Sequence, residues 1–575
     1  MAQLKNHICT ILLLLPLITS IILLFFPKKA KRAMYGFSLI LSVIGFALSL
    51  YLLKGNYSQG QFNFMEKANW IRSFGISYYL GVDGLSLFLV ILTKFLMPIA
   101  ILSSYTAIKD RIKTYLIVFF LLDTAMVGTF MALDLFLFFI FWELMLIPMY
   151  FIIGVWGSEN RIYAAVKFFI FTMVGSALMF VALLFLVAQY KKLTGTITFD
   201  YFELRRVMLP HGIQMALFLA FALSFAIKVP LWPFHTWLPD AHVEAPTAGS
   251  VILAAVLLKM GTYGFMRFAI PLFPYAAFNA GPTIVLLAIT GIIFGSFVAW
   301  MQKDLKKLVA YSSVAHLGFV MLGMFALTNR GMAGSVYQML NHGISTGALF
   351  LLVGVIYERR HTKLIEEFGG LAKVMPAYAA IFVIITLSSI GLPGTNGFVG
   401  EFLILWGTFT SKVLMHPRWL TAIAATGVIL GAVYMLSAVL RVFFGSLKNP
   451  KNKNLPDLNA REWAYLLPMV FLAIFMGLFP NLFMKRIEPS MELIRMDYLD
   501  KAKKCETLTK ATLDKPVDFL LPDGVRGGII FTRPTPPVTA STSNPLSTLR
   551  KVSNPVQMPP IQKDTPPSEG GEGKP

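Results

Sequence analysis

The sequence predicts an all-α integral membrane protein with about fourteen transmembrane helices, and three observations support this fold class. Of the 575 residues, 56% are hydrophobic and only 14% are charged, with a mean hydropathy of +0.68. A soluble domain carries nearly twice that share of charged residues. Apolar runs of roughly 20 residues, long enough to cross a bilayer, recur along most of the chain. Prolines and glycines interrupt two of these runs near ionisable residues.

The apolar runs define the expected helices, which we number in chain order. They cover 8–26, 33–53, 83–105, 113–131, 134–156, 163–189, 212–237, 248–272, 282–302, 308–327, 333–357, 376–408, 418–446 and 462–484. The first run resembles a signal peptide, but it is long for one and lacks an A-x-A-like site. It also ends in the basic cluster KKAKR at 28–32. We therefore expect an uncleaved first helix.

These helices divide the chain into five parts. The parts are residues 1–112 with helices 1–3, residues 113–272 with helices 4–8, residues 273–446 with helices 9–13, residues 447–484 with the final helix, and a tail at 485–575. An offset of five helices inverts the topology, so helices 4–8 and 9–13 are expected to form two inverted five-helix repeats. The tail is rich in Pro, Ser and Thr, which predicts that it is largely disordered. A short docking segment is expected near 525–531.

The formal net charge of +21 is explained by basic loops between membrane helices rather than by binding to nucleic acid. The basic residues lie in short loops between apolar runs, not along one face or arm. If the loop at 28–32 is cytoplasmic, the other odd-numbered loops with basic clusters are cytoplasmic too, and both termini lie outside. Lys191, Lys192, Arg205 and Arg206, in an even-numbered loop, run against this bias. The expected location is the inner membrane of a bacterial cell.

Redox cofactors and nucleotides are not expected in this chain. Cys9 and Cys505 are too few for an iron–sulfur cluster or a disulfide framework. No G-x-G-x-x-G follows a strand pattern, and the phosphate-binding motif G-x-x-x-x-G-K-[ST] is absent from the sequence. Energy must then come from an ion gradient or from a partner that performs redox chemistry.

The two interrupted runs are helices 7 and 12. Helix 7 contains Pro230, and helix 12 contains Pro393 and Gly394. Breaks of this kind free backbone carbonyls, which is tolerated at membrane depth where they face protein or a wet cavity. Interruptions at corresponding positions of two repeats are the best sequence pointer to the working site of a transporter. The alternative interpretation is a pair of simple proline kinks.

Glu143, Lys228 and Lys259 are ionisable residues inside expected helices. Each costs several kcal/mol in the bilayer unless it is paired or hydrated. Burial favours the neutral form of a lysine, and a nearby carboxylate favours the ammonium. A buried lysine with a carboxylate that can approach or withdraw would therefore act as a proton switch. The alternative for Glu143 is a hydrogen-bonded brace between helices.

His316 and His342, in helices 10 and 11, lie near mid-membrane between the lysines and Glu401, which follows the break in helix 12. A single buried histidine is usually a satisfied core residue. Two on consecutive helices fit proton relay steps better, because histidine exchanges protons near neutral pH. Asp123 and Lys94 are also deep, and Asp123 is an auxiliary candidate, whereas the sequence gives Lys94 no role.

Further polar residues cluster after the break in helix 7. His235, Asp240, His242 and Glu244 superficially resemble metal ligands, but no H-E-x-x-H or similar spacing supports a metal. A hydrogen-bonded loop network, with no metal, is the favoured interpretation. Lys303, Lys306, Lys307 and Arg441 lie close to helix ends and are expected either to reach the membrane surface or to act as orienting charges.

Four stretches resemble the antiporter-like membrane subunits of respiratory complex I. They are LGVDGLS at 80–86, FWEL at 141–144, HTWLPDAHVEAPTAGS at 235–250 and YSSVAHLG at 311–318. The resemblance covers residues 1–484. It is closest to the branch known as subunit M of NADH-quinone oxidoreductase, because Glu401 stands where sister subunits usually have lysine. Many relatives lack a lysine at the position of Lys94.

The resemblance implies a proton-translocating subunit that couples redox energy from partner subunits to proton pumping. Glu143 and Lys228 would be the coupled pair, Lys259 and His316 the central relay, His342 its continuation and Glu401 the terminal group. NADH, FMN, iron–sulfur clusters and quinone would belong to partner subunits of the complex, with antiporter-like neighbours on both sides. The alternatives are a subunit of a multisubunit cation/proton antiporter or of a membrane-bound hydrogenase.

Overall fold

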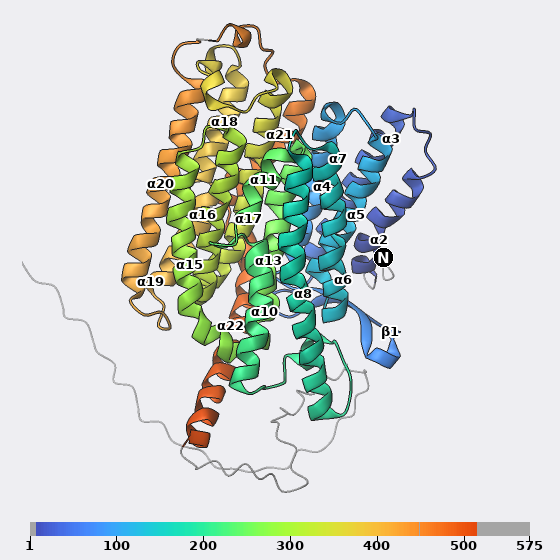
Figure 1. Cartoon of the computed structure of the whole chain (residues 1–575), viewed down its shortest axis with the longest axis vertical. Helices are drawn as coiled ribbons and strands as arrows, with labels where there is room; N and C mark the ends of the chain where they lie inside the picture. Colours follow the sequence, from blue (N-terminus) through green and yellow to red (C-terminus); the bar gives the residue numbers. More distant parts are fainter. Residues whose placement is uncertain (1–6, 448, 514–575) are drawn as a thin grey trace, which may run out of the picture. The chain divides into compact units, whose positions relative to one another are not determined.

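The computed structural model describes residues 7–447 and 449–513, and within them the protein is built almost entirely of helices (Figure 1). The first part contains α2 (Ile8–Leu23), α3 (Lys31–Ser49), α4 (Leu87–Ala107), α5 (Ile112–Met131), α6 (Leu135–Leu144), α7 (Leu146–Trp156), α8 (Arg161–Thr194), α9 (Tyr201–Leu204), α10 (His211–Lys228) and α11 (Trp237–Glu244). The second part contains α12 (Thr247–Ile252), α13 (Leu258–Gly264), α14 (Ile270–Leu272), α15 (Pro274–Trp300), α16 (Leu305–Phe325), α17 (Asn329–Arg360), α18 (Pro376–Ser389), α19 (Asn396–Phe409), α20 (Pro417–Phe443), α21 (Ala460–Leu478) and α22 (Asn481–Leu513).

The expected number of membrane spans is confirmed. Twelve helical segments of the described residues are long and apolar enough to cross a membrane, and the shorter apolar helices α2 and α18 bring the total to fourteen. A helix is the natural form of such segments, because it satisfies every backbone polar group internally where no water is available. Three spans are almost wholly buried by their neighbours: α12 to α14, α16 and α17. They form the interior of the bundle and hold the central part of the site.

Both predicted helix breaks are present. In the seventh span, α10 ends at Lys228, and α11 begins at Trp237 after an irregular stretch that contains Pro230. In the twelfth span, α18 ends at Ser389 and α19 begins at Asn396, with Pro393 and Gly394 between them. The two breaks occupy the fourth helix of each five-helix repeat, although the inverted symmetry of the repeats stays a prediction.

Further irregularities lie in spans that the sequence analysis treated as regular. The fifth span divides at Met145 into α6 and α7. The eighth contains two π-helical stretches, Leu253–Leu257 and Phe265–Ala269, on either side of α13. Such π stretches are frequent at functional sites. The last span continues after a break at Phe479 into α22.

A β-hairpin is an exception to the predicted all-α class. Strands β1 (Asn63–Ile71) and β2 (Ile76–Val82) pair antiparallel and lead directly into α4. Glu66 in β1 accepts hydrogen bonds from the backbone N–H groups of Cys9 (2.7 Å) and Thr10 (3.1 Å). A carboxylate in this position satisfies free donors at the start of α2 and complements the helix dipole. The hairpin thus ties the first helix to the bundle.

The predicted boundary of the tail at residue 485 is wrong. The chain is helical through α22 to Leu513, and Ile487, Met491 and Tyr498 are buried. Ser490 accepts a hydrogen bond from the Gly84 N–H (2.9 Å). A methyl group built on Gly84 would meet the Arg486 carbonyl, so this glycine permits the close approach. Residues 514–575, including the docking segment expected at 525–531, lie outside the described residues.

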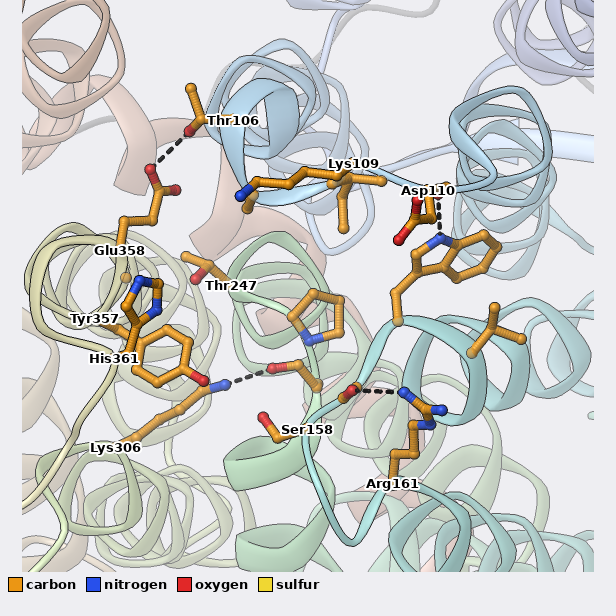
Figure 2. Close-up of a pocket in the computed structure, with 18 of the residues that line it drawn as sticks. Thr106, Lys109, Asp110, Ser158, Arg161, Thr247, Lys306, Tyr357, Glu358 and His361 are labelled. Atoms are coloured by element: carbon orange, nitrogen blue, oxygen red, sulfur yellow. Dashed lines mark hydrogen bonds between the residues drawn. The ribbon is translucent and has the colours of Figure 1, made fainter. Parts of the chain in front are cut away.

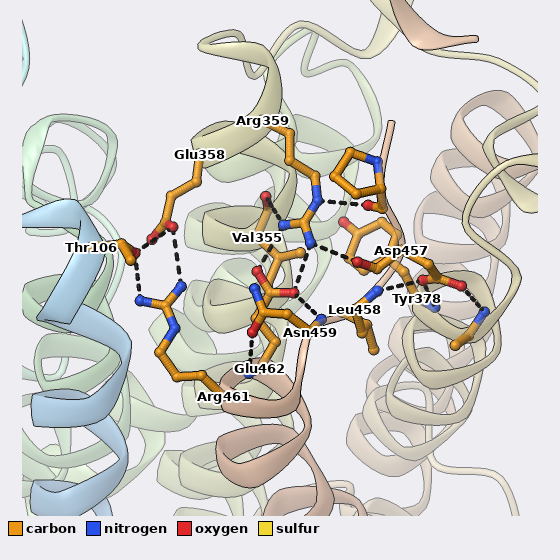
Figure 3. Close-up of polar contacts among 12 residues, drawn as sticks. Thr106, Val355, Glu358, Arg359, Tyr378, Asp457, Leu458, Asn459, Arg461 and Glu462 are labelled. Atoms are coloured by element: carbon orange, nitrogen blue, oxygen red, sulfur yellow. Dashed lines mark hydrogen bonds and ion pairs between the residues drawn. The ribbon is translucent and has the colours of Figure 1, made fainter. Parts of the chain in front are cut away.

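At one end of the bundle, a network of polar contacts fixes α17 to α21, α18 and α4 (Figure 3). Arg359 binds both carboxylate oxygens of Glu462 (2.7 and 2.8 Å). Glu462 also forms a capping box with Asn459 at the start of α21. Next to it, Arg461 pairs with Glu358 (3.3 Å), and Glu358 accepts a hydrogen bond from Thr106 of α4 (2.6 Å). These contacts hold the central helix α17 in register.

Candidate functional site

The ionisable side chains predicted from the sequence lie on the interior helices. Lys228 ends α10, Lys259 lies in α13, His316 in α16, His342 in α17 and Glu401 in α19. Each is at most 7% exposed. Burial at this level requires hydrogen-bond or charge partners, and these partners determine what the site can do.

Lys259, His342, His316 and Glu401 form a connected row. The Lys259 ammonium lies 2.5 Å from Nδ1 of His342 and donates to the Ala254 carbonyl (2.6 Å) in the π-helical stretch. The rings of His342 and His316 lie 5.8 Å apart between centroids. Nδ1 of His316 lies 3.0 Å from Oε1 of Glu401. The row therefore leads from the eighth span to the break in the twelfth.

This geometry orders the residues differently from the sequence expectation. His316 was expected to follow Lys259, with His342 as the continuation. In the structure His342 contacts Lys259, and His316 contacts Glu401. The sequence could not give this order, because it depends on how α16 and α17 face α13 and α19.

Protonation states follow from the contacts. If Lys259 is charged it can only donate, so Nδ1 of His342 must accept and its proton must lie on Nε2. Nε2 of His342 has no hydrogen-bond partner among the described residues. Nε2 of His316 faces the Ser389 hydroxyl at 3.5 Å. Among the described residues, the Nε2 atoms of the two histidines thus have no strong hydrogen-bond partner. Their Nδ1 atoms contact the residues at the two ends of the row, Lys259 and Glu401.

A cavity of about 10 Å³ lies between the two histidines. Its lining includes His316, Asn341, His342 and Thr346. Oδ1 of Asn341 and the Thr346 hydroxyl are buried without a hydrogen-bond partner in the described part of the chain. A volume of about 10–15 Å³ with two to four polar neighbours suits one water molecule.

Glu401 is held by an amide chain that sequence reasoning missed. Nε2 of Gln338 donates to Oε1 of Glu401 (3.0 Å), and Nδ2 of Asn341 donates to Oε1 of Gln338 (3.0 Å). A methyl group on Gly400 would lie 2.4 Å from Oε1 of Gln338, so glycine is needed for this approach. The polar run Gln338, Asn341, His342, at three- and four-residue spacing along α17, was the signal available in the sequence.

The break in the twelfth span brings its backbone close to Glu401. Gly391 has a φ of +77°, which favours glycine. A methyl group there would also lie 3.1 Å from Oε2 of Glu401. Gly394, with a φ of +92°, follows Pro393 in the same loop. The irregular backbone therefore lies next to a buried carboxylate, as expected where a broken helix borders a functional site.

In the part of the chain that the structure describes, Lys228 and Glu143 do not form an ion pair. Nζ of Lys228 lies 3.6 Å from Sδ of Met145 and 4.8 Å from the centroid of the Trp142 ring. Glu143 is half-buried on α6. Oε1 of Glu143 has no hydrogen-bond partner among the described residues. The structure thus holds the expected pair apart, with the α6–α7 break at Met145 between them.

Comparisons with known proteins show the family to which the chain belongs. The family model described as "NADH:quinone oxidoreductase/Mrp antiporter, TM" matches residues 132–446, and "NADH-ubiquinone oxidoreductase chain 4, amino terminus" matches residues 10–129. The chain belongs to this family of antiporter-like membrane subunits. It is 45% identical over 508 residues to NADH-quinone oxidoreductase subunit M of Rhodobacter capsulatus, covering 86% of this chain and 97% of the relative.

Solved structures show the same family architecture. A chain of respiratory complex I from Thermus thermophilus aligns with a TM-score of 0.76 at 33% identity, covering 85% of this chain and 99% of that chain. A chain of the Mrp complex from Dietzia sp. aligns with a TM-score of 0.74 over 87% of this chain and 99% of that chain. Its 19% identity shows likeness of fold alone.

The auxiliary candidates occupy separate places in this antiporter-like fold. Lys94 of α4 and Asp123 of α5 form a buried ion pair (2.8 Å), which gives Lys94 the partner that the sequence did not reveal. Asp240 pairs with Lys167 of α8 (2.7 Å). His235 faces the rings of Phe294 and Tyr311.

The residues after the first break do not converge. His242 stacks on Phe350 with ring centroids 4.5 Å apart, and neither of its ring nitrogens has a hydrogen-bond partner among the described residues. Glu244 accepts from the backbone N–H of Asn160 (3.0 Å). In the described part of the chain, no group of three or more His, Cys, Asp or Glu side chains is arranged to hold a metal ion.

The sequence analysis placed one buried cation wrongly, Lys306, and overlooked another, Arg267. Lys306, expected to reach the membrane surface or to act as an orienting charge, is only 6% exposed and donates to the Ala245 carbonyl (2.5 Å), so it does not reach the surface. Arg267 was not singled out, yet it forms a fully buried ion pair with Asp83 and a hydrogen bond with Tyr263 (3.3 Å). An arginine inside the apolar run of the eighth span was a signal for a buried partner.

Proposed function

We propose that this chain conducts protons across the membrane as the antiporter-like subunit of an NADH:quinone oxidoreductase, along Lys259, His342, His316 and Glu401. The observation that carries the proposal is this connected row of buried titratable groups. Each member can bind and release a proton, and ionisable groups in membrane spans mark ion pathways. The row ends at a broken helix, where freed backbone groups tolerate water.

Proton transfer along the row uses both nitrogens of each histidine. Charged Lys259 gives a proton from Nζ to Nδ1 of His342, and the proton on Nε2 of His342 leaves toward the small cavity. A water molecule, for which the cavity has room, would together with the Ser389 hydroxyl connect it to Nε2 of His316. His316 then gives the proton on Nδ1 to Oε1 of Glu401. One proton leaves Lys259 and one arrives at Glu401, so charge balances at every step.

Glu143 and Lys228 would control the row through charge. Approach of the carboxylate stabilises the Lys228 ammonium, and withdrawal leaves a desolvated cation that favours movement of positive charge toward Glu401. Each elementary charge moves against about 2.3 kcal/mol per 100 mV of membrane potential. A change of about a hundredfold in the proton affinity of Lys228 is of the required size, because each factor of ten corresponds to roughly 1.4 kcal/mol.

The energy for this cycle would come from partner subunits. The chain itself would hold no redox site, and NADH, FMN, iron–sulfur clusters and quinone would be bound by other subunits. Its lateral neighbours would be further antiporter-like membrane subunits. In the inner membrane of a bacterium, the basic odd-numbered loops would face the cytoplasm and both termini the outside.

A cation/proton antiporter or membrane-bound hydrogenase subunit is the competing function. The identities support the quinone oxidoreductase, since the relative named subunit M is 45% identical whereas the Mrp chain is 19% identical. Glu401, in place of the lysine usual in sister subunits and antiporters, supports it further. Co-purification decides between them: affinity-tagged chain should bring down NADH:quinone oxidoreductase activity, and its isolation with an activity independent of NADH would contradict the proposal.

The row itself is tested by Lys259→Met in the purified complex. Met keeps the length of the side chain but cannot carry a proton. We expect NADH-driven proton uptake into proteoliposomes to be nearly abolished in assembled complex. The matched control is Lys303→Met, an exposed lysine on the loop before α16. Pumping by Lys259→Met at the control rate would remove Lys259 from the path.

A further inference from the structure

A cavity of about 1160 Å³, drawn in close-up in Figure 2, is lined by none of the residues of the proton row. The loops after α4, α7, α11 and α17 contribute to its wall, as does the start of α16. The exposed Lys109, in the loop after α4, and the exposed Arg161, the first residue of α8, contribute to it, and Lys306 forms part of its buried wall. The cavity therefore joins segments that are far apart in the sequence.

The charge of the wall is strongly unbalanced. Five cations contribute to it: Lys109, Arg111, Arg161, Lys306 and Lys363. The carboxylates in the wall are Asp110 and Glu358, and Glu358 is already paired with Arg461 (3.3 Å). Across residues 7–447 and 449–513, none of the five cations forms an ion pair with a carboxylate.

Two of these cations are fixed by backbone carbonyls at the end of α11. Lys306 donates to Ala245 (2.5 Å), and Lys363 donates to Val243 (2.7 Å). Carbonyls orient an ammonium group and interact with it through the helix dipole, but they do not neutralise it. The nearby Glu244 carboxylate accepts instead from the Asn160 N–H. Because burial disfavours the charged form of Lys306, the positive charge of the wall rests on Lys109, Arg111, Arg161 and Lys363.

We propose that this cavity binds a phosphate-bearing anion, either free phosphate or the headgroup of an anionic phospholipid. A cleft lined by one sign of charge concentrates the opposite ion and repels like charge, so this one favours anions. Arginine provides paired donors for phosphate oxygens, and lysine provides a point charge. Basic pockets between membrane helices commonly bind phospholipid headgroups. This inference goes beyond the proposed function and does not rest on it.

The test uses the purified complex with the double variant Lys109→Gln, Arg161→Gln. Both side chains are exposed, so their replacement leaves the core intact. The matched control is Lys303→Gln, an exposed lysine from the loop before α16 that is not part of the wall. One arm measures equilibrium binding of radiolabelled inorganic phosphate. The other measures retention of phosphatidylglycerol by native mass spectrometry, after reconstitution with phosphatidylcholine alone or with phosphatidylglycerol added.

The expected result is a loss of about tenfold or more in affinity or retention for the double variant, with the control unchanged. Loss in the phosphate arm identifies a free anion as the ligand, and loss confined to the lipid arm identifies a headgroup. If the double variant binds both probes as tightly as the wild-type complex, the cavity is not an anion site. Equal loss in Lys303→Gln would show a general surface-charge effect and would also overturn the proposal.

Discussion

We expect Gln338→Leu to slow proton release from Glu401 while leaving the complex assembled. Nε2 of Gln338 donates to Oε1 of Glu401 at 3.0 Å, next to the contact from His316. Both side chains are buried. Leucine is similar in volume but donates no hydrogen bond, so the ionised carboxylate loses one of its two donors.

The size of the effect follows from this single contact. A hydrogen bond to a charged group contributes roughly 1.5–3 kcal/mol. Its loss destabilises ionised Glu401 by that amount, so we expect proton release from Glu401, and with it pumping, to slow by about tenfold to a hundredfold.

The assay is proton pumping and quinone reduction measured side by side, normalised to assembled complex. Thr408→Val is the matched control, because Thr408 is buried on the same helix as Glu401 and donates only to the Ile404 carbonyl (2.8 Å). Wild-type pumping by Gln338→Leu would refute the role of the amide chain. The same loss of pumping in Thr408→Val would assign the effect to helix packing.

Three further predictions concern the switch, the terminal group and the tail. Glu143→Gln should nearly abolish pumping in fully assembled complex, and wild-type pumping in proteoliposomes would contradict the switch. Glu401→Lys should impair pumping less than Glu401→Ala, because lysine can still exchange a proton and the Gln338 amide can turn to accept from it; greater damage from Lys would place Glu401 outside the path. Truncation after Leu513 should leave turnover unchanged, whereas truncation before Asn481 should reduce the amount of assembled complex, since Ile487, Met491 and Tyr498 are buried; a large loss after Leu513 would show that the last segment docks on a neighbour.

Much of the fold was predictable because the bilayer leaves few choices. Span number and both broken helices follow from apolar length and from the positions of Pro230, Pro393 and Gly394. The hairpin at 63–82 and helix α22 were not predictable in the same way. Neither is among the segments that are long and apolar enough to cross a membrane, and the polar sequence of α22 resembles a tail although Met491 and Tyr498 are buried against the bundle.

The identity of the candidate site residues was easier to predict than their arrangement. Lys228, Lys259 and Glu401 stand out in the sequence because charge inside a membrane span is costly. The order of His342 and His316 depends on the rotation of two long helices about their axes, which no local pattern specifies. Gln338 was missed because an uncharged amide is cheap to bury when paired, and its partner Glu401 lies 63 residues away.

The two halves of the proposed pathway differ in kind. From Lys259 to Glu401 the polar groups lie within hydrogen-bond reach or across a gap of about one water molecule. Around Lys228 the contacts are the sulfur of Met145 and the face of Trp142, neither of which relays protons. A charge in such an apolar setting acts over distance, because the interior screens it weakly. Lys228 is therefore suited to switch the row by its field, while the row itself stays connected.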